Sequence, residues 1–143
     1  MPTHDQIIQF IQNEIRVGEV LENSDIEYDL GCTGDDFSEL IEKYAEYYQV
    51  DMSSYLWYFH PFEEGSNFPG NFFFKSPNAR VKRIPVTPKL LLEFAKTGKW
   101  DLVYPQHILP KRRYDIIANQ IFSVILIVIA IYFFLKKWMF TVE

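Results

Sequence analysis

The segment DLGCTGDDFSELIEKYAEYYQVD, residues 29–51, has the amphipathic pattern of an α-helix that begins near residues 33–36. Its large apolar and aromatic side chains recur at intervals of three and four residues, which places them on one face of the helix. They are Phe37, Leu40, Ile41, Tyr44 and Tyr48. Acidic side chains lie between them and can remain in water. The segment therefore predicts a helix with one buried face and one exposed acidic face.

The beginning of this helix is also acidic. Asp35 and Asp36 lie in its first turn, where carboxylates are stabilised by the positive end of the helix dipole. We expect Thr33 to cap the helix, because threonine is favoured at the N-cap position. Cys32 precedes a helix N-terminus, a place that lowers the pKa of a thiol. It has no neighbouring His or Lys in sequence, so a reactive thiol is the less favoured interpretation.

A second helix is predicted near the N-terminus. Thr3 and Gln6 form the T-x-x-Q pattern of a capping box. Apolar residues then recur at helical spacing, so this helix should bury one face as well. A polar loop is expected over residues 19–29.

The segment after residue 51 predicts less regular structure. Ser53 is interpreted as the cap of a short third helix, which Pro61 stops. Residues 65–80 are rich in Gly, Pro and Asn around three consecutive phenylalanines, Phe72 to Phe74. We interpret residues 65–80 as a structured loop with one short strand.

A further helix of about ten residues is predicted after this loop. Thr87 is its expected cap, Pro88 occupies the first helical position and Gly98 ends it. Trp100 is expected to fold back over the helix end. Residues 101–110 contain two prolines and are interpreted as a linker.

The run IIANQIFSVILIVIAIYFFL, residues 116–135, contains no charged residue. Its 20 residues would span about 30 Å as a helix, the thickness of a bilayer core. Basic residues precede it at Lys111, Arg112 and Arg113, and lysines follow it. A buried helix of a soluble core would show a polar stripe, which this run lacks. The run therefore predicts a single transmembrane helix.

Charge around the predicted span indicates its orientation. The first ten residues lack a basic region and a cleavage site, so they are not interpreted as a secretory signal. More basic residues precede the span than follow it, and positive loops remain in the cytoplasm. We therefore expect a single-pass protein of the inner (cytoplasmic) membrane, with its N-terminal domain in the cytoplasm.

Composition limits the classes of protein that remain. The 143 residues suit one domain. The chain has one cysteine and three scattered histidines, which argues against a structural zinc site and a disulfide framework. Residues 1–64 carry a net charge of −13 and residues 65–143 a net charge of +8, which together give the net charge of −5. This asymmetry favours an electrostatic interaction surface over nucleic-acid binding. The acidic residues lack the spacing of a calcium loop, and we expect no catalytic residues and no metal.

Residues 29–51 resemble the central segment of an acyl carrier protein. In that family the pattern D-L-G-x-D-S-L-D-x-x-E-L is followed by a helix and a short turn. The matching residues are Asp29, Leu30, Gly31, Asp36, Glu39 and Leu40, with Val50 and Asp51 after the helix. The resemblance implies a small helical bundle.

The chemistry of the carrier family does not transfer with this resemblance. Gly34 stands where carrier proteins have the serine that accepts a phosphopantetheine arm. Glycine has no hydroxyl, so we expect no such cofactor. Ser38 lies one turn deeper and is interpreted as an ordinary polar helix residue.

Two other segments extend the resemblance. They are YLWYFHPFEE at residues 55–64 and the pattern T-x-x-x-L-x-x-x-A-x-x-G-x-W at residues 87–100. Together with the carrier-like segment they are similar to a small bacterial family, domain of unknown function family 1493, whose members are described as acyl-carrier-like. The similarity covers roughly residues 7–100, and the C-terminal membrane helix lies outside it. The resemblance implies a fold and no established activity.

The predicted fold class is mainly α: an acyl-carrier-like helical bundle with a short irregular or β segment, plus one C-terminal transmembrane helix. The predicted parts are a cytoplasmic domain over 1–100, a linker and basic segment over 101–115, the membrane helix over 116–135 and a short tail over 136–143.

The expected function is non-catalytic protein binding by a membrane-tethered domain. The partner-binding residues are predicted to be Asp35, Asp36, Glu39 and Glu42, while Lys111, Arg112 and Arg113 face the membrane surface. The carrier resemblance implies a partner with a basic surface, such as an acyl-transfer or lipid-synthesis enzyme. Two alternatives stay open: a working carrier modified at an atypical hydroxyl, and a structural subunit of a membrane complex. A third possibility is that the acidic half docks on basic residues of its own chain, Arg80, Lys82 and Arg83.

Overall fold

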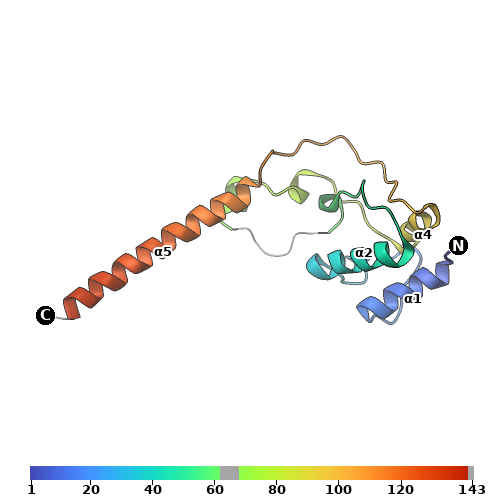
Figure 1. The fold of residues 1–143 in the computed structure, drawn as a ribbon, viewed down its shortest axis with the longest axis horizontal. Helices are drawn as coiled ribbons and strands as arrows, with labels where there is room; N and C mark the ends of the chain where they lie inside the picture. The colour runs from blue at the N-terminus through green and yellow to red at the C-terminus, as the bar shows by residue number, and fades with distance from the viewer. Residues whose placement is uncertain (62–67, 142–143) are drawn as a thin grey trace. The chain divides into compact units, whose positions relative to one another are not determined.

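The computed structural model describes residues 1–61 and 68–141, and within them the chain is mainly helical with no sheet (Figure 1). The elements in order are α1 (His4–Ile15), α2 (Gly34–Tyr48), the 3₁₀ turn η1 (Trp57–Phe59), α3 (Gly70–Phe73), the 3₁₀ turn η2 (Asn78–Arg80), α4 (Pro88–Thr97) and α5 (Tyr114–Thr141). An isolated parallel bridge joins Asp51 to Lys99.

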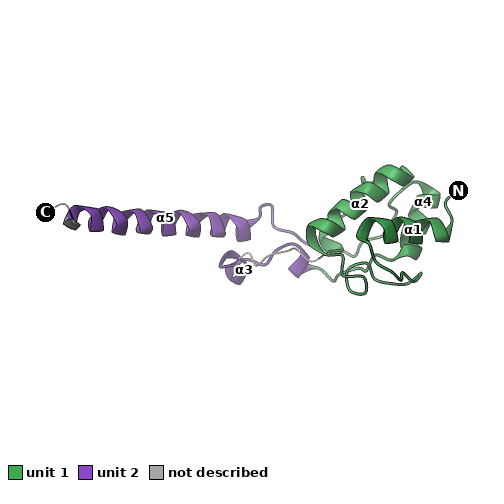
Figure 2. Cartoon of the chain, turned by 90° about the horizontal axis from the view of Figure 1, so that it is seen from below, with its two compact units in different colours: residues 1–64, 81–107 green, residues 65–80, 108–143 purple. Residues whose placement is uncertain are grey.

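The chain divides into two compact units (Figure 2). Unit 1 comprises residues 1–64 and 81–107, and unit 2 comprises residues 65–80 and 108–143. The units do not follow the order of the sequence, because residues 65–80 belong with the C-terminal segment. Each unit is described separately.

Unit 1 is built from α1, α2 and α4 around one apolar core. Every residue expected on the inner face of α2 contributes to this core, and Phe37 and Tyr44 are fully buried. Tyr44 donates a hydrogen bond of 2.5 Å to the carbonyl of Leu91, which ties α2 to α4. Trp100 is also fully buried and contacts the ring of Phe94 at 4.7 Å between centroids. The tryptophan thus folds back on α4 as predicted.

Two of the four predicted capping residues, Thr3 and Thr87, form the expected side-chain cap. Thr3 and Gln6 form a reciprocal capping box at α1. The Thr87 side chain accepts a hydrogen bond from the backbone of Leu90 at α4, which ends at Gly98 in a left-handed conformation with φ 71°. Thr33 occupies the N-cap position of α2, but its side chain makes no capping hydrogen bond, so that part of the prediction is wrong.

The predicted third helix is only a 3₁₀ turn, η1, which begins at Trp57. Ser53 does not cap it. The backbone N–H of Ser53 instead donates to Asp51 Oδ1 at 2.9 Å, which closes a turn directly after residue 51. The residue before η1, Leu56, has an extended backbone whose N–H donates to the Tyr104 hydroxyl at 3.2 Å. Because the Leu56 N–H donates to Tyr104, it is not available for the backbone hydrogen bond that a continuous helix would need.

Residues 101–107, interpreted above as the start of a linker, lie in unit 1. Tyr104 packs beside Phe59, and the Tyr58 hydroxyl lies 2.8 Å from His107 Nε2. The chain has no regular secondary structure here and is held by side-chain contacts.

In unit 2 the short helix α3 packs against the beginning of α5 (Figure 2). The predicted strand is not formed in residues 68–80, where α3 and η2 occur instead; residues 65–67 lie outside the described part of the chain. The backbone N–H of Gly70 donates to Asn119 Oδ1 at 2.6 Å. Phe74 lies against Tyr114, with 5.9 Å between ring centroids.

The helix α5 is long and apolar enough to cross a membrane over residues Tyr114–Met139. The α5 helix extends the predicted run by two residues at its N-terminal end and six at its C-terminal end. Its side chains from Gln120 to Met139 are exposed, so the described chain does not bury them as a soluble core would.

Candidate functional site

The four carboxylates predicted to bind a partner lie on the solvent side of α2. Asp35, Asp36, Glu39 and Glu42 are all exposed. The first three alternate with the buried Phe37 and Leu40, so the helical repeat directs them away from the core. In the described residues, Asp35, Asp36 and Glu42 form no ion pair, which leaves their charges directed to solvent.

Glu39 differs from the other three because a lysine neutralises it. Lys43, one turn further along α2, lies 2.9 Å from Glu39 and 2.8 Å from Glu14 of α1. Hydrogen bonds from Lys43 lower the pKa of Glu39, and those to Glu14 and Glu39 raise the pKa of Lys43. All three groups are exposed enough that water screens the interaction. Glu39 therefore contributes less net charge to the surface than the sequence alone indicates.

A small apolar hollow lies beside Glu42, between α2 and residues 52–57. Its volume is about 340 Å³. It is lined by Ser38, Ile41, Glu42, Ala45, Met52, Tyr55 and Trp57. Trp57 is 40% exposed. An apolar centre beside carboxylates is the arrangement found in the core and rim of protein interfaces.

A second, more polar hollow lies beside the first turn of α2. Gly34 is buried and has a positive φ of 53°. The hydroxyl of Ser38 donates a hydrogen bond to the Gly34 carbonyl at 3.1 Å. The adjoining hollow, of about 450 Å³, is lined by Asp36, Glu39 and Lys43 together with residues 14–16 and 30–32.

Cys32 borders this hollow but does not have the properties of a reactive thiol. It is buried, with 5% of its surface exposed. Burial and the carboxylates of Asp36 and Glu27 raise its pKa to about 11. The helix N-terminus was expected to act in the opposite direction, and burial outweighs it. The side chain therefore stays protonated at neutral pH.

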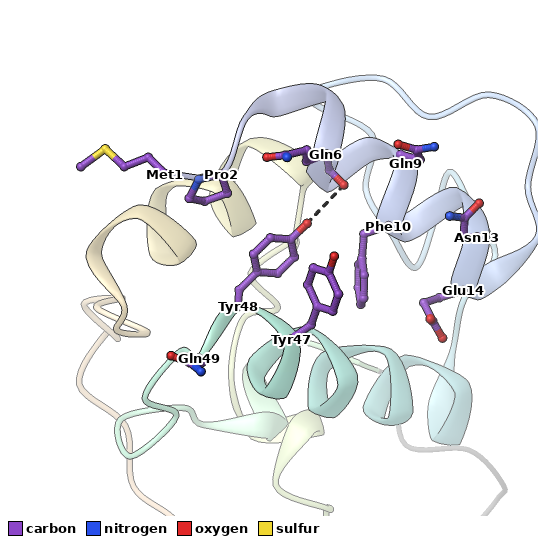
Figure 3. Close-up of a pocket in the computed structure, with 10 residues that line it drawn as sticks. All are labelled: Met1, Pro2, Gln6, Gln9, Phe10, Asn13, Glu14, Tyr47, Tyr48 and Gln49. Atoms are coloured by element: carbon purple, nitrogen blue, oxygen red, sulfur yellow. Dashed lines mark hydrogen bonds between the residues drawn. The ribbon is translucent and has the colours of Figure 1, made fainter.

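An aromatic groove separates α1 from the C-terminal half of α2 (Figure 3). Its volume is about 690 Å³. The ring of Phe10 lies 5.6 Å from that of Tyr47, which is 71% exposed. Tyr48 closes the base of the groove by donating a hydrogen bond to the Gln6 carbonyl at 3.2 Å. The helical spacing predicts Tyr48 on the buried face, where it is partly buried, and predicts nothing for Tyr47.

Arg83 binds acidic residues of the loop before α2 rather than α2 itself. Its guanidinium forms two hydrogen bonds of 2.6 Å with the carboxylate of Asp25. Its Nε lies 2.5 Å from the buried carboxylate of Glu27. Burial alone would raise the pKa of Asp25, but the hydrogen bonds from Arg83 hold it below the usual value. The charge attraction predicted within the chain thus exists, but with other carboxylates than those of α2.

His60, which carries no functional signal in the sequence, is fully buried in unit 1. Its Nδ1 lies 3.0 Å from the carbonyl of Ile84, and its Nε2 lies 2.8 Å from the Tyr104 hydroxyl. Because a carbonyl only accepts, Nδ1 carries the proton and Nε2 accepts from Tyr104. A single histidine among aromatic residues gives no signal of this network in the sequence, because its partners lie 24 and 44 residues away.

The three basic residues before α5 are not equivalent. Lys111 and Arg112 are exposed. Arg113 forms a 2.6 Å ion pair with Asp115, whose carboxylate is 2% exposed. In residues 1–61 and 68–141, no three His, Cys, Asp or Glu side chains form a group that could hold a metal ion.

Comparison with known proteins identifies the family and adds no activity. No curated protein and no solved structure matches the chain. A family described as "Protein of unknown function (DUF1493)" matches residues 4–104, which include nearly all of unit 1. The match covers α1, α2 and α4 and ends before α5. The chain therefore belongs to the DUF1493 family and has in addition a C-terminal apolar helix.

Proposed function

We propose that this protein is a membrane-tethered interaction module in which α2 and the apolar hollow beside it bind a protein partner. The observation that carries this proposal is the hollow of about 340 Å³ next to Glu42. It would receive an apolar side chain, while Glu42 and Asp35 would attract basic residues around it. Hot spots of interfaces commonly combine a buried anchor with a surrounding polar rim. The chain itself performs no catalysis in this proposal.

The charges of the surface define the kind of partner. A basic partner would meet Asp35, Asp36 and Glu42 first, and opposite charges accelerate such an encounter. The resemblance to acyl carrier proteins supports an acyl-transfer or lipid-synthesis enzyme as the partner, since carriers present the corresponding helix to basic docking patches. Binding of this type weakens with salt, because the Debye length is about 8 Å at physiological ionic strength.

The membrane orientation belongs to the same proposal. The α5 helix crosses the inner membrane once, with unit 1 in the cytoplasm. The exposed bases Lys111 and Arg112 would contact the anionic leaflet at the cytoplasmic end of α5. Labelling of a single introduced cysteine at Leu21 in intact cells tests this orientation. An impermeant maleimide that labels the residue without lysis would contradict it.

Site-specific photocrosslinking in intact membranes tests the binding surface. A photoreactive amino acid at Glu42 or Trp57 should crosslink one protein partner, which mass spectrometry identifies. The matched control is Glu93, an exposed carboxylate on α4, where the same probe should yield no such product. If positions 42 and 57 crosslink nothing beyond the control position, the proposed surface is wrong.

Charge reversal then measures the electrostatic part with the purified partner. Asp35→Lys combined with Glu42→Lys should weaken binding at least tenfold, which is ~1.4 kcal/mol. Glu93→Lys should leave the dissociation constant unchanged. Glu39 is avoided, because its reversal would also break the contact with Lys43. Equal effects of the two variants would exclude a specific role for α2.

The alternative of a working carrier is tested by mass. Co-expression with a phosphopantetheinyl transferase should leave the mass of the chain unchanged, because Gly34 has no hydroxyl. A gain equal to the prosthetic arm, mapped to Thr33 or Ser38, would replace the interaction module with a carrier. The alternative of a structural subunit predicts crosslinks from α5 to another membrane protein, with none from α2.

A further inference from the structure

Unit 2 displays phenylalanines on the segment that packs against the beginning of α5. Phe68, Phe72 and Phe73 are 69%, 78% and 69% exposed. Large aromatic side chains with so much surface in water are unfavourable unless another phase or molecule covers them. Neither α5 nor the rest of the described chain covers them.

Two backbone contacts hold this segment at a defined level along α5. Gly70 donates its N–H to the side chain of Asn119 at 2.6 Å. Its α-carbon also lies so close to α5 that an added β-carbon would be 1.9 Å from the carbonyl oxygen of Asp115. The α3 helix is therefore fixed beside residues 115–119, just before the uninterrupted apolar part of α5 begins.

The level of α3 corresponds to a membrane interface. If the apolar part of α5 occupies the hydrocarbon core of about 30 Å, residues 114–119 lie near its boundary with the headgroups. Aromatic rings are enriched at this boundary. The exposed bases Lys75, Arg80, Lys111 and Arg112 belong to the same unit and match the negative charge of an anionic leaflet. The exposed phenylalanines therefore lie next to the apolar part of α5, which would itself contact lipid.

We propose that residues 68–74 form an interfacial membrane anchor, in which Phe68, Phe72 and Phe73 insert among the lipid headgroups beside the beginning of α5. The occupant of this apolar surface is the lipid bilayer. The inference rests on α5 crossing the membrane, and it is independent of which partner binds unit 1.

The depth of single fluorophores in nanodiscs tests the anchor with the full chain. The environment-sensitive dye NBD is attached to a single cysteine in a Cys32→Ala background, and the nanodiscs contain phosphatidylcholine and phosphatidylglycerol. The test positions are Phe72→Cys and Phe73→Cys, made separately so that the result does not depend on one variant. Leu126→Cys marks the centre of α5, and Leu21→Cys, which lies between acidic residues in unit 1, marks water.

At positions 72 and 73 we expect blue-shifted emission relative to position 21. Lipids with a nitroxide near the headgroup should quench the emission at these positions more strongly than lipids with a nitroxide deep in the acyl chain. Position 126 should show the reverse order, which establishes separately that α5 spans. Emission at 72 and 73 equal to that at 21 would overturn the anchor. Blue-shifted emission that neither lipid quenches would also overturn it, because the rings would then contact protein.

Discussion

At the scale of single residues, the buried His60 imidazole of unit 1 is held by aromatic rings and by hydrogen bonds at both ring nitrogens. Tyr55 stacks on it at 5.2 Å between centroids, and Trp100 contacts it edge-on at 5.3 Å. The Tyr104 hydroxyl that donates to His60 accepts in turn from Trp100 Nε1 at 2.9 Å. Burial, together with the positive charge of Arg83, lowers the pKa of His60 to about 4, although the bond to Ile84 acts in the other direction. The histidine is neutral in the folded protein at pH 7.

This lowered pKa predicts a loss of stability in mild acid. The unfolded chain takes up a proton at His60 near pH 6.5, whereas the folded chain does so only near pH 4. Stability is therefore complete above pH 6.5 and falls as the pH decreases toward 4, by about 2 kcal/mol at pH 5. Chemical denaturation of the full chain in nanodiscs, followed by near-ultraviolet circular dichroism, measures this slope.

The matched variants are His60→Asn and His107→Asn. The first removes the titrating group but keeps a side-chain N–H for the carbonyl of Ile84, so the slope between pH 6.5 and about 5 should disappear. Below about pH 5 carboxylates with lowered pKa values, such as Asp25, still contribute a slope. His107 is exposed, and its replacement should leave the slope in place. A slope above about pH 5 that survives His60→Asn would assign the acid sensitivity to another group.

Arg83 is the second residue on which unit 1 depends. It joins the loop before α2 to residues 81–86, and its Nε also donates to the carbonyl of His60 at 2.8 Å. The carboxylate of Glu27 that it contacts is buried. Removal of Arg83 would leave the buried Glu27 carboxylate without its counter-charge.

Arg83→Met should therefore destabilise the protein by about 3 kcal/mol or more, because a buried carboxylate loses its counter-charge. Arg80→Met is the control. Arg80 is exposed and should change the free energy of unfolding by about 0.5 kcal/mol at most. Similar losses for the two variants would show that the contacts of Arg83 with Asp25 and Glu27 contribute little.

At the scale of elements, the contact between α3 and α5 depends on the absence of a side chain at Gly70. A β-carbon there would lie 1.9 Å from the Asp115 carbonyl oxygen and 2.8 Å from Asn119 Oδ1. Both atoms belong to α5, whose backbone cannot yield without losing helical hydrogen bonds. A four-residue helix such as α3 has little stability of its own, so this contact decides whether it stays in place.

Gly70→Ala should consequently separate α3 from α5. Spin labels at Lys75→Cys and Phe122→Cys, both exposed positions, report the distance between the segments by pulsed electron resonance. We expect a longer and broader distance distribution in the Gly70→Ala variant. Gly18→Ala is the control, because nothing lies within 4 Å of a β-carbon at that position. An unchanged distribution would mean that α3 is held by other contacts.

At the scale of the whole molecule, charge is divided between the two units. Unit 1 has a formal net charge of −10 and unit 2 of +5, which sum to −5. An anionic leaflet attracts the exposed bases before α5 and repels the acidic residues of unit 1. In the proposed tether, this division of charge would leave α2 accessible to a partner in solution.

The tether predicts that the protein cannot be removed from membranes by salt or alkali. Electrostatic attachment would be lost in high salt, whereas a spanning helix remains in the bilayer. Ultracentrifugation after a high-salt and an alkaline wash should leave the full chain in the pellet. Deletion of residues from Tyr114 onward should move the remainder to the supernatant as a folded domain. Release of the full chain by salt would contradict a spanning α5.

Local sequence patterns were sufficient for α1, α2, α4 and α5. Each of these has a regular arrangement of apolar residues, and each of α1 and α4 has a capping residue that acts within three positions along the chain. The exposed positions of Asp35, Asp36, Glu39 and Glu42 follow from the same helical repeat. These features depend on residues that are close in sequence, so they can be predicted before the tertiary structure is known.

Other features were decided only when distant segments came together. The bonds of His60 and the pairing of Arg83 with Asp25 each join segments far apart in the chain. Burial reversed the expected pKa shift of Cys32, and Lys43 of α2 also pairs with Glu14 of α1, 29 residues earlier in the chain. The helix α3 formed where a strand was predicted, because its stability comes from the close approach of Gly70 to α5. The sequence by itself thus determined the helices with their own periodicity and the charge of each surface. Tertiary structure alone decided the buried polar groups and short elements, because burial and long-range hydrogen bonds set their energies.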